Sequence, residues 1–484
     1  YVTGAWSVMH AFDAATGERL WTHDPQVPRG HSRFVCCDVV NRGQAFYRGQ
    51  VYAGTLDGRL VSVTAEGGDL VWESQTTPVG EAYSITGAPR IAGGKVLIGS
   101  GGAEYGVRGY VSAYDAATGE LSWRVYTVPG NPADGFESDA MAAAAETWSG
   151  EWWEAGGGGT AWGAIVYDPE LDLVYIGVGN GSPWYRQLRS PGGGDNLYLS
   201  SILAVRASDG EYVWHFQTTP GDNWDYTATQ PLMLLDLTID GRERQVIVQA
   251  PKNGFFYVVD RLTGELLSAE TFGDDVTWAT EIDPESGRPV ETAEARYGMN
   301  RRGAYLSPGP TGSHNWRPMS WNAETGLVYL PAQNTQSYYE MANSLVYTQG
   351  RWNTGTTIRG GGTPRAERGE RPELTGPRTM LLAWDPVTNS EVWRATGKGG
   401  NGGTLSTAGN LVFWGTGNVM VAYDAQSGEE LWSAEVGRNT ATPATYVLDG
   451  RQYITIAGGS GGRNDAPRVT TFTLDALSAA DPGN

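Results

Sequence analysis

Two adjacent cysteines, Cys36 and Cys37, are the only cysteines in this chain of 484 residues. A disulfide between neighbouring residues closes a small ring, because ordinary disulfide geometry needs more separation than one trans peptide allows. Such a bond would connect no distant parts of the chain, so loop-closure entropy cannot explain it. Its value would be local, as a rigid, sulfur-faced platform for a flat molecule. The alternative is a pair of reduced thiols that fill buried space.

Further polar side chains lie in glycine-rich segments that could form a site. Glu104 stands among glycines and has no obvious role in a turn, so it is hard to dismiss as structural. Asn180 and Asp225, taken singly, are more typical of turn formers. Taken alone, Lys252 would be interpreted as a surface residue and Trp162 as a core residue. Five segments stand out in this way: residues 36–43; 84–89 with 99–109; 156–162 with 177–184; 220–226; and 251–254 with 330–334.

A repeated hairpin motif indicates which elements position these segments. Its clearest copy, residues 11–21 (AFDAATGERLW), is typical of a strand, a tight turn containing Asp and Gly, and a second strand. The first three motif tryptophans, Trp21, Trp72 and Trp123, repeat every 51 residues, a period typical of a four-stranded propeller blade. The other copies, some of them degenerate, are residues 62–72, 113–123, 204–214, 258–268, 383–393 and 422–432, with an irregular copy at 322–329.

The repeat predicts an all-β fold, an eight-bladed β-propeller that forms one domain over residues 1–484. We expect the motif tryptophans to dock between neighbouring blades, so most of the 19 Trp residues are structural. The polar, Gly- and Arg-rich stretch at about 343–379 breaks the rhythm and predicts a long surface loop. Propeller loops converge on a central channel, which is where we expect the polar segments to meet.

Composition narrows the class of protein. A formal net charge of −20 argues against nucleic-acid binding and suits a basic partner. No apolar run is long enough to span a membrane, and the absence of Cys-x-x-Cys-His indicates that this chain carries no c-type haem. The chain starts at Tyr1 without an initiator Met, so we expect the true N-terminus, with any targeting peptide, to be missing. The five His residues lack ligand spacing.

Together, the motifs resemble the quinoprotein alcohol dehydrogenases, the family of the methanol dehydrogenase large subunit. The resemblance runs in order from near residue 1 to near residue 475. It implies an eight-bladed propeller that holds pyrroloquinoline quinone (PQQ) and a calcium ion and oxidises an alcohol to an aldehyde or ketone. PQQ is a flat tricarboxylate, which suits the cysteine platform. The motifs that carry the resemblance are CCDVVNRG (36–43), GAEYGVRGY (102–110), GNGSPW (179–184), WDY (224–226) and KNGFFYVVDR (252–261).

The resemblance implies how the cofactor is bound. Cys36 and Cys37 would form a disulfide on one face of PQQ, and Trp162 would cover the other face. Lys252 would hydrogen-bond the reactive quinone oxygens. Further positions that match contacts to the carboxylates, carbonyls or wall of the cofactor site are Val40, Arg42, Thr86, Gly101, Gly102, Ala103, Glu104, Thr160 and Asn334.

The resemblance also implies a metal site and a base. Glu104, Asn180 and Asp225 match the calcium ligands, and oxygen donors of these types suit a hard cation. Asp225 matches the base that accepts the proton of the alcohol, while hydride passes to PQQ. Lys252 would stabilise developing negative charge. The position two residues after the base is Thr227, where lanthanide-using members have Asp, so the expected metal is calcium.

Two departures from the family bear on the substrate. Gly400 and Ser460 stand where the family usually has Trp, which predicts a wider, more polar mouth and an alcohol bulkier than methanol or ethanol. An alternative is a quinoprotein that oxidises polyols or polymeric alcohols. A more distant alternative is a cofactor-free propeller scaffold, which would lack the cysteine pair and the Glu104 segment. We expect a periplasmic enzyme that passes electrons to a separate acceptor, such as a cytochrome c.

Overall fold

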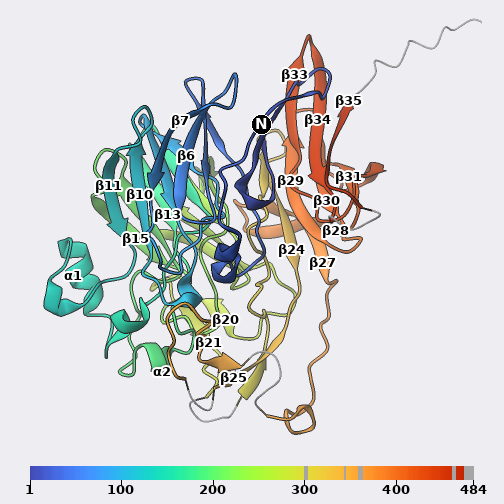
Figure 1. The fold of residues 1–484 in the computed structure, drawn as a ribbon. Coiled ribbons are helices and arrows are strands. Elements are labelled where there is room, and N and C mark those ends of the chain that lie inside the picture. Colours follow the sequence, from blue (N-terminus) through green and yellow to red (C-terminus); the bar gives the residue numbers. More distant parts are fainter. Residues whose placement is uncertain (299–302, 343–344, 358–362, 461–464, 474–484) are drawn as a thin grey trace, which may run out of the picture. The chain divides into compact units, whose positions relative to one another are not determined.

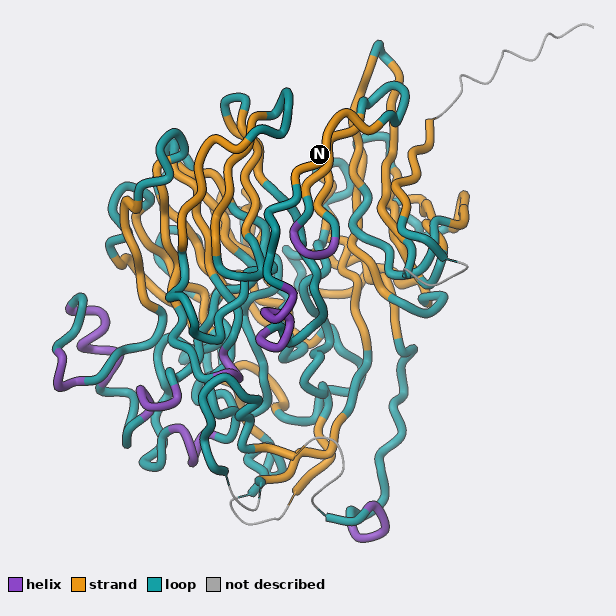
Figure 2. The backbone as a smooth tube through the Cα atoms, in the orientation of Figure 1, coloured by secondary structure: helices purple, strands orange, loops and turns teal. Residues whose placement is uncertain are grey.

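Strands joined by loops make up most of the chain (Figures 1 and 2). The computed structural model describes all residues except 299–302, 343–344, 358–362, 461–464 and 474–484. Contacts divide the chain into two compact units, which are described separately below. Unit 1 comprises residues 1–13, 17–316 and 335–374, and unit 2 comprises residues 14–16, 317–334 and 375–484. None of the helices in the described ranges is long and apolar enough to cross a membrane.

Unit 1 contains, among its described residues, five antiparallel sheets in which consecutive strands pair in chain order. The first sheet has three strands and the other four have four strands each. Their strands are β1 (Val2–Thr3), β2 (Met9–Phe12) and β3 (Arg19–His23); β4 (Ala45–Tyr47), β5 (Gln50–Gly54), β6 (Arg59–Thr64) and β7 (Leu70–Gln75); β8 (Arg90–Ala92), β9 (Lys95–Gly99), β10 (Tyr110–Asp115) and β11 (Leu121–Tyr126); β12 (Ile165–Asp168), β13 (Leu173–Gly177), β14 (Ser201–Arg206) and β15 (Tyr212–Gln217); and β16 (Leu232–Ile239), β17 (Arg242–Gln249), β18 (Phe255–Asp260) and β19 (Leu266–Thr271).

Unit 1 also contains two smaller sheets and short helices that lie in its loops. The smaller sheets are β20 (Ala279–Ile282) with β21 (Pro289–Glu291), and β22 (Gly303–Leu306) with β25 (Ser337–Met341) and β26 (Thr356–Thr357). The helices are α1 (Asp139–Ala145), α2 (Arg186–Arg189), and the 3₁₀ turns η1 (Ala5–Ser7), η2 (Arg29–Phe34), η3 (Ala103–Tyr105), η4 (Pro132–Asp134), η5 (Trp152–Ala155) and η6 (Arg365–Glu367).

Unit 2 contains three further sheets of the same kind in its described part. They are β23 (Ser320–Asn322), β24 (Leu327–Gln333), β27 (Thr379–Asp385) and β28 (Ser390–Thr396); β29 (Asn401–Thr407), β30 (Leu411–Thr416), β31 (Val419–Asp424) and β32 (Glu430–Glu435); and β33 (Ala444–Leu448), β34 (Arg451–Gly458) and β35 (Arg468–Thr473). The sheets of this type in both units agree in number with the eight blades that the repeat predicts. The expectation of a single domain stays a prediction.

The motif tryptophans join neighbouring sheets, as the repeat predicted. The indole N–H of Trp72, on β7, donates to the carbonyl of Ala116 in the next sheet at 3.1 Å. The ring lies on Gly119, where a Cβ atom would stand 2.6 Å from the indole. In unit 2, Trp393 makes the same contacts with Ala425 and Gly428. In most copies, the motif glycine therefore provides the turn and also the space for a tryptophan from the sheet before it, whereas Gly17 and Gly326 have open space at that place.

The core lies between the sheets. One cluster of buried residues collects Val111 on β10, Val174 on β13 and Leu203 on β14, which come from two consecutive sheets. Another joins the sheets β12–β15 and β16–β19 and includes Trp224 and Tyr226, both fully buried. The loop that contains Asp225 is therefore anchored in the core by an aromatic residue on each side.

Strand direction explains why the polar segments gather at one end of each sheet. Consecutive strands are antiparallel, so the loop between the second and third strands lies at the same end as the connection to the next sheet. Glu104, Asn180 and Lys252 follow the second strands β9, β13 and β17, and Asp225 connects β15 to β16. The motif turns join third and fourth strands, so they lie at the opposite end.

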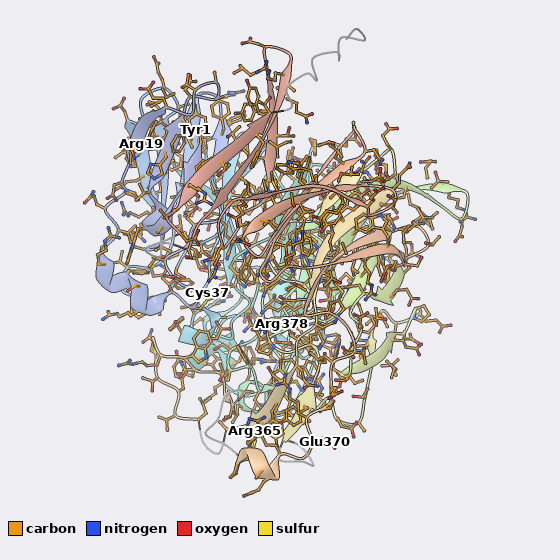
Figure 3. The ribbon with its side chains drawn as sticks, turned by 90° about the vertical axis from the view of Figure 1, so that its right-hand side faces the viewer. Tyr1, Arg19, Cys37, Arg365, Glu370 and Arg378 are labelled. Carbon is orange, nitrogen blue, oxygen red and sulfur yellow. A yellow bond between two sulfur atoms is a disulfide. The ribbon has the colours of Figure 1, made fainter. Side chains whose placement is uncertain are left out.

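The stretch that breaks the repeat, residues 343–379, is mostly irregular in its described part, and the predicted surface loop stays a prediction. Residues 343–344 and 358–362 lie outside the described residues. The described part contains the short strand β26 and the turn η6. Arg365 and Glu370 project exposed side chains from it (Figure 3). Residues 347–354 pack against other parts of unit 1 through hydrogen bonds that are described with the site.

Replacing Gly119 by Ala tests the role of the motif glycine. Gly119 has a φ of +74°, so the variant bears the strain of a left-handed alanine, about 1–2 kcal/mol, and also displaces Trp72. We expect a total loss of roughly 2–5 kcal/mol in the free energy of unfolding, measured by denaturant titration. Gly241→Ala is the control, because Gly241 has a φ of +73° and open space around it. Equal losses in the two variants would contradict the docking role.

Candidate functional site

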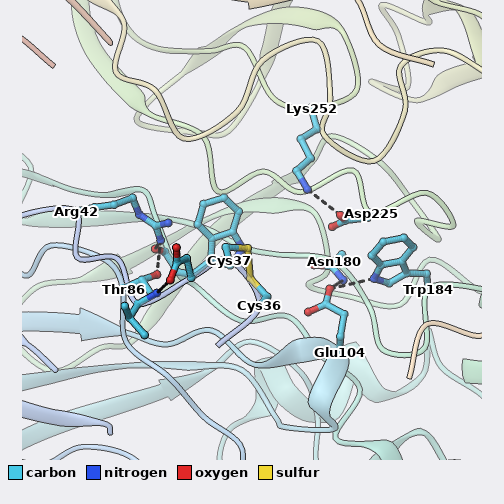
Figure 4. Close-up of a disulfide and its surroundings, with 12 residues drawn as sticks. Cys36, Cys37, Arg42, Thr86, Glu104, Asn180, Trp184, Asp225 and Lys252 are labelled. Atoms are coloured by element: carbon cyan, nitrogen blue, oxygen red, sulfur yellow. Dashed lines mark hydrogen bonds and ion pairs between the residues drawn. A yellow bond between two sulfur atoms is a disulfide. The ribbon is translucent and has the colours of Figure 1, made fainter. Parts of the chain in front are cut away.

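The two cysteines form a disulfide (Figure 4). Cys36 and Cys37 lie in the turn that follows η2, with their Cα atoms 3.8 Å apart. Both residues are exposed, so the alternative of buried, reduced thiols is wrong. Val40, nearby in the chain, is also exposed, with 38% of its surface accessible. The vicinal disulfide therefore presents a short, rigid surface rather than filling the core.

Arg42, Thr86 and Trp162 form a second part of the site. The guanidinium of Arg42 donates to the hydroxyl of Thr86 and to the main-chain carbonyl of Trp162, both at 2.7 Å. Its central carbon lies 4.9 Å from the centroid of the Trp162 ring. Burial lowers the pKa of Arg42 to about 10, so the side chain stays charged at neutral pH. The result is a fixed cation beside an indole, a combination suited to a flat anion.

The glycine-rich segment before Glu104 approaches its neighbours through the backbone. Gly101 and Ser84 exchange two main-chain hydrogen bonds, at 2.7 and 3.2 Å. Gly102 has a φ of +122°, and a Cβ atom there would lie 2.5 Å from the carbonyl oxygen of Ala82. Only glycine fits that position. Ala103, which follows, is buried.

Two further residues, Thr160 and Asn334, were matched to the cofactor. Thr160 is buried in unit 1, in the stretch before β12. Asn334 belongs to unit 2, where its side chain donates to the carbonyl of Pro377 at 3.0 Å.

Glu104 receives two hydrogen bonds at the same carboxylate oxygen. Oε1 accepts from the side-chain amide of Asn180 at 2.8 Å and from the indole N–H of Trp184 at 3.0 Å (Figure 4). Sequence reasoning singled out Glu104 and Asn180 and placed Trp184 only within a motif. The turn η3 positions Glu104, and the loop between β13 and β14 supplies both donors. The structure therefore brings two of the three expected metal ligands into contact.

The segment that breaks the repeat holds Glu104 and Trp184 in place. The backbone N–H of Asn353 donates to the carbonyl of Glu104 at 2.8 Å, and the carbonyl of Thr354 accepts from the N–H of Trp184 at 2.8 Å. The ring of Trp352 packs edge-on against Trp184, with centroids 6.4 Å apart. Sequence reasoning treated this segment as a surface loop and missed the contact. Asn353 and Thr354 thus fix the backbones of Glu104 and Trp184, the two residues whose side chains bond to each other.

Asp225 and Lys252 form an ion pair of 2.9 Å (Figure 4). Their side chains are 13% and 7% exposed, so the pair is largely removed from water. Burial raises the pKa of the Asp225 carboxyl well above its ordinary value, and the charge of Glu104 raises it further, while Lys252 opposes both effects. The repulsion between Asp225 and Glu104 shows that the two carboxylates share one electrostatic environment.

This set of donors suits a hard cation better than a soft one. Glu104 and Asp225 offer carboxylate oxygens and Asn180 an amide oxygen, which are ligands typical of Ca²⁺. Within the described ranges, no three or more His, Cys, Asp or Glu side chains cluster so that they could hold a metal ion. An ion at this place would therefore use two carboxylates, the amide and further oxygens. It would also relieve the repulsion between the two carboxylates.

Comparisons with known proteins identify the family of the chain. A family model described as the glucose/ethanol/alcohol dehydrogenase β-propeller domain, named PQQ, matches residues 1–269 and 376–454. The chain is 52% identical to the quinohemoprotein alcohol dehydrogenase ADH IIB of Pseudomonas putida, over 100% of this chain and 71% of the relative. It is 46% identical to the 1-butanol dehydrogenase (cytochrome c) of Thauera butanivorans, over 96% of this chain and 67% of the relative.

A solved structure gives the same result for the fold. The crystal structure of the quinohemoprotein alcohol dehydrogenase from Comamonas testosteroni superposes with a TM-score of 0.90 at 47% identity, covering 98% of this chain and 72% of that one. The curated sequence of the Comamonas testosteroni enzyme is covered over 65% of its length, less than two thirds. On this evidence the chain is a β-propeller that belongs to the family of PQQ-dependent alcohol dehydrogenases.

Proposed function

We propose that this chain oxidises an alcohol to an aldehyde or ketone, with PQQ as the electron acceptor and calcium as the metal. The observation that supports the proposal best is the buried Asp225–Lys252 pair in the same environment as Glu104. The buried carboxylate of Asp225 has the ammonium of Lys252 beside it and is repelled by the carboxylate of Glu104. This arrangement costs free energy unless a bound cation and an anionic ligand compensate the charges.

The residues proposed to bind PQQ belong to two parts of unit 1, the vicinal disulfide and the group formed by Arg42, Thr86 and Trp162. The disulfide of Cys36 and Cys37 would cover one face of the ring system, and Trp162 the other. Arg42 is charged and already directed toward Trp162 and Thr86, so it would pair with a carboxylate of the cofactor. When bound, PQQ supplies the two-electron oxidant that takes the hydride from the alcohol. Further contacts are proposed for Val40, Gly101, Gly102, Ala103, Thr160 and Asn334.

Calcium fits the ligand charge at the site. Glu104, Asn180 and Asp225 together contribute two negative charges. Thr227, two residues after the proposed base, is fully buried and its hydroxyl bonds to Gln230 rather than adding a carboxylate. Ligand charge tunes affinity for hard cations, so two carboxylates favour a divalent ion over a trivalent one.

Asp225 is the proposed base, and Lys252 favours its ionised form, which is the form that can accept a proton. In the proposed reaction the Asp225 carboxylate, in its ionised form, accepts the proton of the substrate hydroxyl, which is the role of a positioned general base. Burial favours the protonated, inactive form of Asp225, and the ammonium of Lys252 at 2.9 Å opposes it. Gly312 packs closely on Lys252, because a Cβ atom added at Gly312 would lie 2.6 Å from the Cα atom of Lys252. This contact restricts the backbone from which the Lys252 side chain extends.

The substrate, the electron acceptor and the compartment are also part of the proposal. The relative from Thauera butanivorans is named for 1-butanol and cytochrome c. We propose an alcohol larger than methanol or ethanol, a cytochrome c or similar acceptor, and a periplasmic location. A net charge of −20 suits a basic cytochrome. The relative from Pseudomonas putida is a quinohemoprotein by name and is longer than this chain, so the expected absence of haem stays a prediction about these residues alone.

Asp225→Asn tests the proposed base while it preserves shape. The amide cannot accept the proton, so turnover of an alcohol by protein loaded with PQQ and calcium should fall by about 10²–10⁴-fold in a dye-reduction assay. Asp240→Asn is the control, because Asp240 is exposed and shares a positive φ, +51° against +66° for Asp225. Wild-type turnover in the Asp225 variant would exclude it as the base.

Trp184→Phe tests how Glu104 is positioned for the metal. The variant keeps an aromatic ring and loses the N–H that bonds Glu104, so the calcium concentration that half-saturates PQQ loading should rise about 10- to 100-fold. The measurement is PQQ absorbance during a calcium titration of chelator-treated protein. Trp148→Phe is the matched control, because Trp148 is also buried and donates only to the carbonyl of Leu197. The same calcium requirement in both variants would show that Trp184 has no part in metal binding.

A further inference from the structure

Arg189 is a buried arginine between two loops that carry proposed site residues. It ends α2 and is only 2% exposed. Neither the hairpin repeat nor the cofactor motifs single it out. All five of its N–H donors are hydrogen-bonded, and their acceptors come from three separate segments of the chain.

The first segment carries Asn180 and Trp184. One terminal nitrogen of Arg189, Nη1, donates to the carbonyl of Pro183 and, at 2.9 Å, to the carbonyl of Trp184. The guanidinium also lies on Gly181, where a Cβ atom would be 2.4 Å from its central carbon. The backbone directly after Asn180 is therefore shaped to receive this side chain. The same cation fixes the carbonyl of the residue whose indole holds Glu104.

The second segment carries Asp225. The other terminal nitrogen, Nη2, donates to the carbonyl of Asp222 at 2.7 Å. The carboxylate of Asp222 accepts the backbone N–H groups of Trp224 at 3.1 Å and Tyr226 at 3.0 Å, the residues on either side of Asp225. Asp225 has a φ of +66°, a conformation that costs an L-residue free energy and needs such support.

The third segment is an anchor. Nε and Nη2 donate to the side-chain oxygen of Asn196, at 3.2 and 3.1 Å, and Asn196 donates to the carbonyl of Thr147 at 3.1 Å. Burial lowers the pKa of Arg189 to about 10, and the charge of Asp222 opposes that change, so the guanidinium stays charged at neutral pH. The buried arginine and the buried aspartate compensate each other.

We propose that Arg189 is a positioning residue that sets the separation between the Asn180–Trp184 loop and the Asp225 loop. The inference rests on the proposed function, because it assigns these loops to one calcium site. A planar guanidinium can bond to both loops and the anchor at once, whereas the ammonium of lysine has three donors on a single atom. Charge alone would therefore not replace it.

Arg189→Lys is the test, with Arg288→Lys as the control. The side-chain hydrogen bonds of Arg288 go to the exposed carboxylate of Asp195 rather than to either loop. Three quantities are measured for each protein: the calcium concentration that half-saturates PQQ loading without alcohol, kcat at saturating calcium, and the unfolding midpoint of the metal-free protein. For Arg189→Lys we expect the calcium requirement to rise about tenfold or more and kcat to fall. For Arg288→Lys we expect the values of the unchanged protein.

The outcomes separate the inference from the proposed function. A lower unfolding midpoint with an unchanged calcium requirement would make Arg189 merely structural and overturn the inference. If Arg189→Lys does not fold, Asn196→Gly is measured in its place. Glycine accepts the φ of +57° at this position and removes the side chain that anchors Arg189. The calcium requirement should then rise several-fold, and an unchanged requirement overturns the inference. Failure of the unchanged protein to load PQQ with calcium would instead reject the proposed function.

Discussion

The buried ion pair between Asp225 and Lys252 is the interaction on which the rest of the site depends. Two charges with side chains only 13% and 7% exposed need compensation from their surroundings, because their hydration is lost. Glu104 adds a further negative charge to the same environment. The site thus contains more carboxylates than the ammonium of Lys252 can pair with, which favours binding of a metal cation. This constraint links the proposed base, the proposed metal and the proposed cofactor to one place in the fold.

The sheets place these charges together through strand direction. Each loop between second and third strands lies at the same end as the connection to the next sheet, so successive sheets contribute Glu104, Asn180, Asp225 and Lys252 in chain order. The tryptophan hairpins lie at the other end and hold neighbouring sheets together. The loops at the end of each sheet that carries the proposed site can therefore differ in sequence from one sheet to the next. The tryptophan contacts at the opposite end do not depend on those loops.

Much of the fold was predictable from the sequence, because one short hairpin motif indicates the two strands, the turn between them and the tryptophan that docks on the next sheet. The motifs around Cys36, Glu104 and Asp225 also singled these residues out, and their roles stay predictions. Trp184 was within one of these motifs, but its bond to Glu104 depends on a rotamer that no local pattern specifies. Arg189 and Asn353 were not predictable at all. Their contacts join loops far apart in the sequence, and a single arginine or asparagine is more often exposed than buried.

Reconstitution of the chelator-treated protein tests the central claim most directly. The protein is incubated with PQQ, with and without added Ca²⁺, and the reduction of a dye is followed across a panel of alcohols. The account predicts dye reduction that depends on alcohol, PQQ and calcium together, and none when any of the three is omitted. Alcohol-dependent reduction of equal rate without calcium, or no binding of PQQ at all, would contradict it.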